Sequence, residues 1–260
     1  IQPDIIVCRS ERSIPNDQRK KISLFCNVPI ENVVETVDVK TIYEAPISFH
    51  NEKLDKLVLN FFSLKPKKKV NLRPWKNITN IILKNKKKLN IAIVGKYVDL
   101  KDAYKSLDEA LIHGGIENKV NINLERIESD KINKLNSSKK LKKISGILIP
   151  GGFGSRGTEG KIAAIKHARI SKTPFLGICF GMQMAVIEFA RNVLKINDAG
   201  STEFHKKCFP IVGLISEWEK DGKLIKGTKS DLGGTMRLGA YKAKLRHNSL
   251  INKIYKSKEI

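Results

Sequence analysis

A cysteine between two glycines is the residue of this sequence best placed to do chemistry. Cys179 lies between Gly177 and Gly181, after the apolar segment 174–178 and before the helix-forming run 182–190. The first segment predicts a short buried strand and the second a helix. At the turn between them the sulfur would be exposed, and the positive end of the helix favours the nucleophilic thiolate. The pattern indicates a nucleophile, whereas a lone cysteine is more often a small buried hydrophobic residue.

A glycine-rich segment supplies a second part of such a site. Residues 144–149 predict another buried strand, and the sequence PGGFG at 150–154 follows it directly. Ligands of an open parallel sheet bind beyond the carboxyl ends of its strands, so this segment and Cys179 are expected on the same rim. Main-chain amides of a glycine turn can approach an oxyanion closely and donate to it. On its own, the segment would indicate an ordinary loop.

Strands and helices alternate around these two segments. The order predicts a parallel sheet with helices on both faces, with strands at 89–97, 120–127, 144–149 and 174–178 and helices at 103–113, 162–170 and 182–190. The first quarter of the chain predicts a further strand near its start and helices at 16–27 and 53–62. A lysine-rich, proline-containing connection at 67–88, helical around 75–83, lies between the two parts.

The composition fits a globular protein with a basic surface. The 260 residues are 41% hydrophobic and carry a formal net charge of +23. Lysine runs such as 84–88 contain no nucleic-acid-binding signature, so we expect no specific nucleic-acid partner, only nonspecific binding at low salt. Cys8, Cys26, Cys179 and Cys208 lack disulfide or metal-ligand spacing, and no long apolar segment is present. We therefore expect a cytoplasmic protein with no membrane association, and Cys8 and Cys26 in the core.

Several motifs together resemble the class I glutamine amidotransferases, and more closely the CTP synthase family. The matching segments are 150–154, 156–157, 159–160, 176–179, 181–183, 201–204 and 229–239. The resemblance implies an α/β fold in which a doubly wound parallel sheet forms a flavodoxin-like glutaminase domain. The C-terminal part of a P-loop-type α/β synthetase domain would precede it. The implied boundaries are 1–66 for the synthetase part, 67–88 for a linker and 89–260 for the glutaminase.

The resemblance also implies that the chain is a fragment. Relative to the family, it lacks an N-terminal phosphate-binding loop with magnesium carboxylates and a C-terminal segment with the histidine and glutamate of the triad. His205 and His247 follow the nucleophile, but neither is followed two residues later by an acid. We therefore assign no histidine to catalysis and expect the fragment alone to be inactive or weakly active.

The implied activity is that of a ligase in pyrimidine nucleotide synthesis. Glutamine hydrolysis at Cys179 would release ammonia, which aminates UTP to CTP at the expense of ATP. By resemblance, glutamine would be bound by Gly152, Phe180, Gly181, Met182, Gln183 and Glu203. The nucleotide-binding residues would be Lys21 for the pyrimidine nucleotide, Val37, Asp38 and Val39 for the adenine of ATP, and Arg9 for phosphate, which a guanidinium binds in bidentate fashion.

Further ligands follow from the same resemblance. GTP would act as an allosteric activator through a lid at 231–239 and the region 96–105, and CTP as a product inhibitor. Mg²⁺ would accompany ATP, with its ligands outside this chain, and no metal site is expected among these residues. The complete protein would be a homotetramer.

Two alternatives stay open at this point. One is a different class I amidotransferase, such as one serving GMP or carbamoyl phosphate synthesis, although the run 230–239 argues against it. The other is a noncatalytic basic remnant that binds nucleic acid or protein.

Overall fold

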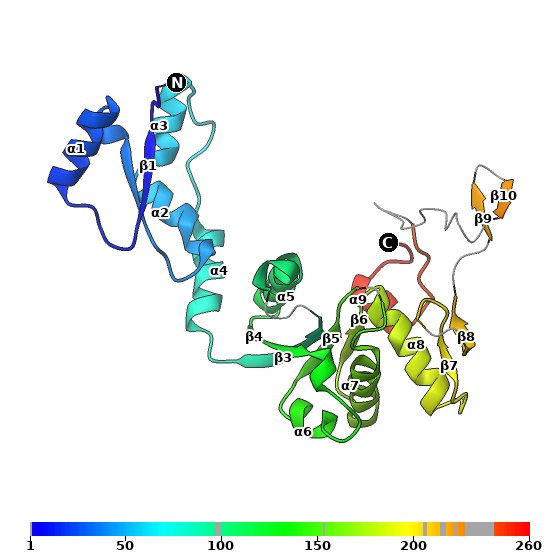
Figure 1. Ribbon diagram of the computed structural model, residues 1–260. Coiled ribbons are helices and arrows are strands. Elements are labelled where there is room, and N and C mark those ends of the chain that lie inside the picture. The colour runs from blue at the N-terminus through cyan, green and yellow to red at the C-terminus, as the bar shows by residue number, and fades with distance from the viewer. Residues whose placement is uncertain are drawn as a thin grey trace. The chain divides into compact units, whose positions relative to one another are not determined.

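The computed structural model describes residues 2–96, 100–152, 154–204, 207–213, 217–220, 223–226 and 242–260. The chain divides into two compact units, Ile1–Lys195 and Ile196–Ile260. The elements of both are labelled in Figure 1. The first unit contains a two-stranded and a four-stranded parallel sheet, and Cys179 lies in this unit.

The first part of this unit is a strand–helix–strand arrangement followed by helices. β1 (Ile6–Ser10) pairs in parallel with β2 (Val33–Val37), and α1 (Asn16–Cys26) connects them. The helices that follow are α2 (Ala45–Asn51), α3 (Leu54–Phe61) and α4 (Arg73–Lys84), with short 3₁₀ turns at Ile30–Asn32 and Ile42–Glu44. The expected helices at 16–27, 53–62 and 75–83 are thus confirmed, whereas α2 was not expected.

The four-stranded sheet is entirely parallel. Its strands are β3 (Lys88–Gly95), β4 (Asn121–Glu128), β5 (Gly146–Ile149) and β6 (Phe175–Gly177), in the order β4-β3-β5-β6. The chain adds β4 on one side of β3 and then returns to add β5 on the other. This reversal creates a switch point between β3 and β5, where open parallel sheets bind ligands beyond their carboxyl ends.

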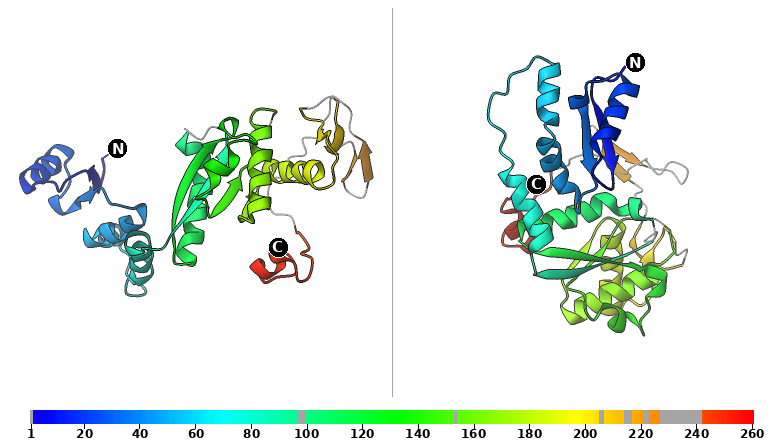
Figure 2. Two further views of the ribbon diagram at one scale, coloured as in Figure 1. Left: turned by 90° about the horizontal axis from the view of Figure 1, so that it is seen from below. Right: turned by 90° about the vertical axis from the view of Figure 1, so that its left-hand side faces the viewer.

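Helices cover both faces of this sheet, as Figures 1 and 2 show. α5 (Lys105–Glu117) lies on one face, and α7 (Thr158–Ser171) and α8 (Phe180–Asn192) lie on the other, as right-handed crossovers in opposite directions require. Shorter elements are the 3₁₀ turns η3 (Lys101–Tyr104) and η4 (Ser129–Lys131) and the helix α6 (Ser137–Leu141). The predicted doubly wound α/β fold is confirmed.

The core lies between the sheet and α7 and α8. Every residue of β5 is buried, as are Ile93 and Val94 of β3. Met184 and Ile187 of α8 are fully buried. Arg169 of α7 donates through Nη2 to Oε1 of the buried Glu188 at 2.8 Å, so a charged hydrogen bond also joins the two helices.

Two expectations about burial are wrong. β6 is a strand, but it is the edge of the described sheet, and Leu176 at its centre is 52% exposed. Cys8 on β1 and Cys26 on α1 are only half-buried, since neither two-stranded pairing nor a single helix encloses a side chain completely.

The second unit has short strands and one helix. β7 (Ala199–Ser201) pairs in parallel with β8 (Phe209–Val212), β9 (Glu217–Lys220) pairs antiparallel with β10 (Lys223–Lys226), and α9 (Leu250–Tyr255) follows. Across the described residues of the whole chain, no helix has the length and apolar character needed to cross a membrane.

Two adjacent glycines of α5 give a direct test of this packing. A Cβ on Gly115 would lie 2.6 Å from Cγ1 of Ile122, whereas a Cβ on Gly114 would meet nothing within 4 Å. Gly115→Ala is expected to lower the free energy of unfolding by about 1–3 kcal/mol through overpacking. Gly114→Ala is expected to raise it by about 0.5–1 kcal/mol through helix propensity. Urea unfolding of the two variants checks this, and equal effects would contradict the packing of α5 on β4.

Candidate active site

Cys179 lies at the tip of a sharp turn between β6 and α8. It immediately precedes α8, has φ 53° and ψ −105°, and is exposed. A non-glycine residue in such a conformation costs on the order of 1–3 kcal/mol and persists only where its surroundings hold it. Cys179 is exposed, and it lies at the N-terminus of a helix, where the positive end of the helix dipole is located.

Two glycines permit this turn by close backbone contact. A Cβ on Gly181 would lie 2.1 Å from the carbonyl oxygen of Ile149, and one on Gly177 would lie 2.6 Å from the carbonyl carbon of Gly181. The amide of Ile178 donates to the same Ile149 oxygen at 2.9 Å. The turn is therefore fixed against the end of β5, and side chains at either glycine would displace it.

The glycine segment lies beside the sulfur-bearing residue. A Cβ on Gly151 would lie 3.6 Å from Cβ of Cys179. Gly152 has φ 155° and Gly154 has φ 78°, which side chains rarely allow. Phe153, between them, is outside the described residues. The structure thus brings the expected oxyanion segment next to the expected nucleophile at the carboxyl ends of β5 and β6.

The ammonium groups of two buried lysines lie close to the glycine segment 150–154. Lys161 on α7 is 1% exposed, and its ammonium is 4.6 Å from the centre of the Phe180 ring. Lys96, directly after β3, is also buried, and its Nζ donates to the carbonyl oxygen of Gly154 at 3.3 Å. Burial, followed by the charge of Lys96, lowers the pKa of Lys161 to about 8, while Asp130 opposes this shift.

An arginine ties the glycine segment to η4. Arg156 donates to Glu128 at 2.7 Å and to Asp130 at 3.1 Å. These carboxylates raise the pKa of Arg156, against the effect of its desolvation. These two ion pairs keep the loop after β5 close to the end of β4. The loop is therefore held at the ends of both strands.

The expected glutamine-binding residues fall in both units. Phe180 and Gly181 are buried in the first turn of α8, Gln183 is half-buried and Met182 is exposed. Glu203 belongs to the second unit, where it is exposed and its amide donates to Oγ of Ser201 at 3.2 Å. The structure brings the α8 residues and Gly152 together around Cys179.

No catalytic base emerges from the described residues. His247 is exposed in the second unit, and His205 lies outside the described residues. The expected lid at 231–239 also lies outside them. Within the described ranges, no group of three or more His, Cys, Asp or Glu side chains is placed to hold a metal ion.

The expected nucleotide residues gather at the ends of β1 and β2, with one exception. Nε of Arg9 donates to Oδ1 of Asp38 at 2.7 Å, and this ion pair raises the pKa of Arg9. Val37, Asp38 and Val39 line a cavity of about 440 Å³. Lys21 is exposed on α1 and does not line that cavity.

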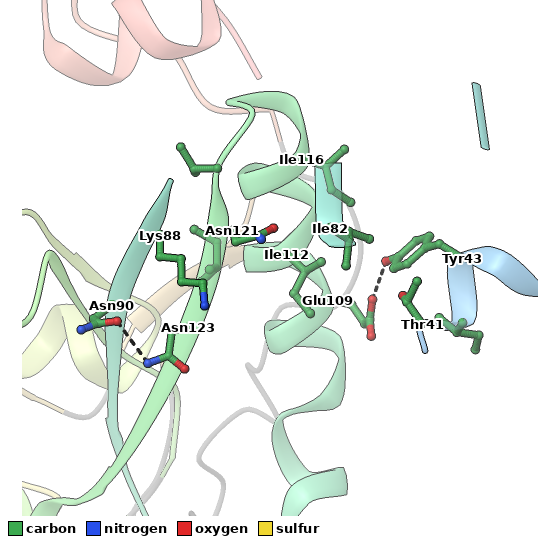
Figure 3. A pocket seen from close by; sticks show the side chains of 13 residues that line it. Thr41, Tyr43, Ile82, Lys88, Asn90, Glu109, Ile112, Ile116, Asn121 and Asn123 are labelled. Atoms are coloured by element: carbon green, nitrogen blue, oxygen red, sulfur yellow. Dashed lines mark hydrogen bonds between the residues drawn. The ribbon is translucent and has the colours of Figure 1, made fainter. Parts of the chain in front are cut away.

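A second cavity, of about 630 Å³, lies at the opposite end of the four-stranded sheet from Cys179. Lys88 and Asn90, at the amino end of β3, line it. Figure 3 shows Tyr43 directed toward Glu109 of α5, and its hydroxyl donates to that carboxylate at 2.6 Å. Burial and this hydrogen bond raise the pKa of Tyr43 to about 12. The cavity is separate from the cysteine site.

Sequence reasoning missed Lys161. Its spacing within the helix could have indicated burial. Lys161 shares a helix face with Ile162, Ile165 and Ala168, which are buried. Lysine is almost never fully buried unless it is paired, so a lysine on a buried helix face is an exception that needs a physical reason.

Two family models match this chain. The model described as "Glutamine amidotransferase class-I" matches residues 99–259, and the model described as "CTP synthase N-terminus" matches residues 1–64. The proposed boundaries at 66 and 88 stay a prediction.

Curated relatives match over the whole chain. The chain is 72% identical over 260 residues to the CTP synthase of Pelagibacter ubique (strain HTCC1062) and 53% identical over 261 residues to that of Rhizobium johnstonii. Each match covers 100% of this chain and 48% of the relative, so the chain spans about half the length of these proteins.

A solved structure supports the same relationship. The structure of the Trypanosoma brucei CTPS glutaminase domain with bound acivicin matches with a TM-score of 0.53 and 31% identity. It covers 66% of this chain and 64% of that one. The chain therefore belongs to the class I glutamine amidotransferase family and is similar to CTP synthases over its whole length.

Proposed function

We propose that this chain contains the glutaminase active site of a CTP synthase and part of its synthetase domain. The observation that carries the proposal is Cys179, exposed at a strained turn before α8 and adjacent to Gly151. A strained, exposed cysteine at a helix N-terminus has the geometry of a nucleophile. The similarity to CTP synthases supports glutamine as its substrate.

The first reaction is acyl transfer. The Cys179 thiolate attacks the side-chain amide carbon of glutamine, and the C–N bond breaks as ammonia leaves with a proton. Water then hydrolyses the γ-glutamyl thioester to glutamate and restores the thiol. The amides of Gly152 and Phe180 are the proposed donors to the oxyanion. Glu203, whose carboxylate can accept from an ammonium group, is the proposed partner of the glutamine amino group.

The second reaction uses ammonia to aminate UTP that ATP has phosphorylated. The cavity beside Val37, Asp38 and Val39 is the proposed position of the adenine, and Arg9 the proposed phosphate contact, since a guanidinium suits phosphate oxygens. Mg²⁺ would accompany ATP and neutralise phosphate charge, with no described residue proposed as its ligand. GTP activation, CTP inhibition, a homotetramer and a cytoplasmic location complete the proposal.

Replacing the nucleophile should separate the two reactions. The test uses a full-length CTP synthase that carries these 260 residues, because the chain spans about half of its relatives. Cys179→Ser is expected to abolish CTP formation from glutamine and to leave CTP formation from free ammonia within about twofold, because serine is not activated at this site. Cys208→Ser is the matched control and should retain both activities. Equal loss of both activities in Cys179→Ser would contradict the assigned role.

Labelling distinguishes the proposal from a noncatalytic remnant. A chloromethyl ketone analogue of glutamine is expected to alkylate Cys179 before Cys8, Cys26 or Cys208, because Cys179 alone among these is exposed. Glutamine should slow the reaction, whereas asparagine should not. Peptide mass spectrometry of the 260-residue chain measures both effects. Equal labelling of the four cysteines that glutamine does not slow would favour the noncatalytic alternative.

The nucleotide residues should act independently of the glutaminase. Lys21→Ala is expected to raise the KM for UTP, and Asp38→Ala the KM for ATP, each about tenfold, because a lost contact leaves polar ligand atoms unpaired. Ammonia-dependent synthesis by the full-length enzyme measures both, with Lys20→Ala and Glu31→Ala as exposed controls. Unchanged nucleotide dependence combined with impaired glutamine hydrolysis would show that the division between the two parts is wrong.

A further inference from the structure

We infer that Lys161 is a positioning residue whose buried ammonium supplies the positive charge that supports the oxyanion formed when Cys179 attacks its substrate. The inference rests on the proposed function, because it assigns a role within the same glutaminase site.

The position of Lys161 is the first observation. It is the fourth residue of α7 and is 1% exposed. Its Nζ lies 4.0 Å from the point where a Cβ on Gly152 would be, and 4.6 Å from the centre of the Phe180 ring. The ammonium therefore lies next to both residues whose amides are the proposed oxyanion donors.

The surroundings of this ammonium are unusually positive. Lys96 follows β3 and lies over the same ring at 5.9 Å, and the N-terminal turns of α7 and α8 add the positive ends of two helix dipoles. The acid that acts on it is Asp130 of η4, which is already paired with Arg156. Cys179 immediately precedes Phe180 at the start of α8, and β5 and β6 contain no titratable side chain. Among the described residues no carboxylate forms an ion pair with Lys161.

A buried cation without a paired anion is costly, so its presence beside Gly152 and Phe180 points to an anion that forms only during the reaction. Preorganised positive charge acts most strongly where water is excluded and negative charge develops in the transition state. The cation–π contact with Phe180 offsets part of the cost of burial and holds the ammonium in place. The tetrahedral oxyanion at Gly152 and Phe180 is the anion that fits this place.

The charge state of Lys161 makes the inference testable by pH. Burial, and then the charge of Lys96, lower its pKa to about 8. The ammonium is therefore mostly charged below about pH 8 and mostly neutral above it. Its contribution to glutamine hydrolysis should be present at neutral pH and lost as the pH rises through about 8.

The experiment measures kcat and KM for glutamine hydrolysis by the full-length enzyme from about pH 6.5 to 9.5. Lys161→Met keeps an unbranched side chain and removes the charge. At neutral pH it should lower kcat about tenfold, less than the loss of a direct oxyanion donor, with KM changed less than about twofold. The ratio of wild-type to variant kcat should fall toward one above pH 8. Lys166→Met, on the same helix, should leave kcat unchanged.

Each outcome decides the inference. A ratio that stays constant across the pH range would show a purely structural effect and overturn it. Thermal melting and ammonia-dependent synthesis would reveal whether Lys161→Met fails to fold. In that case the pH dependence of kcat in the wild-type enzyme decides, and a kcat that does not decline above pH 8 would overturn the inference. Absence of glutamine hydrolysis in the wild type would instead remove the proposed function, and the inference with it.

Discussion

The close packing of the first turn of α8 against the end of β5 is the constraint on which this site depends. The backbone of Gly181 lies against the carbonyl oxygen of Ile149, where a methyl group would approach to 2.1 Å. That contact, together with the Ile178–Ile149 hydrogen bond, holds Cys179 at positive φ. Packing of α8 on α7, with the ion pair between Arg169 and the buried Glu188, stabilises the helix in this place. The backbone strain at Cys179 is thus offset by the packing of α8 on β5 and α7.

The same strand end also positions the glycine segment, and two buried cations lie close to that segment. β5 runs directly from Ile149 into Pro150 and Gly151, so the nucleophile and the oxyanion segment share one support. The chain carries 49 lysines and arginines, most of them on its surface, but Lys96 and Lys161 are buried at this point. Because buried charge is screened far less than surface charge, these two matter more to the chemistry than the net charge of +23.

Local sequence patterns predicted the parts of the site that depend on local backbone geometry. Gly177, Cys179 and Gly181 indicated the turn by their spacing alone. Gly177 lies against the backbone of Gly181, four residues away, whereas the contact of Gly181 with the carbonyl oxygen of Ile149 is long-range. The alternation of apolar segments with helical runs predicted the doubly wound sheet. The exposure of β6 and the half-burial of Cys8 were not predictable in this way, because they depend on which elements neighbour them in space. Burial of Lys161 depends similarly on α8 and η4, which its own segment does not specify.

Direct detection of the acyl intermediate tests the central claim most closely. The full-length enzyme would be acid-quenched while it hydrolyses glutamine, digested at low pH, and its peptides examined by mass spectrometry. The account predicts a γ-glutamyl thioester on Cys179, since this thiolate attacks the amide carbon and ammonia leaves before water enters. A γ-glutamyl group on another residue, or sustained hydrolysis with unmodified Cys179 when deacylation is slowed, would contradict it.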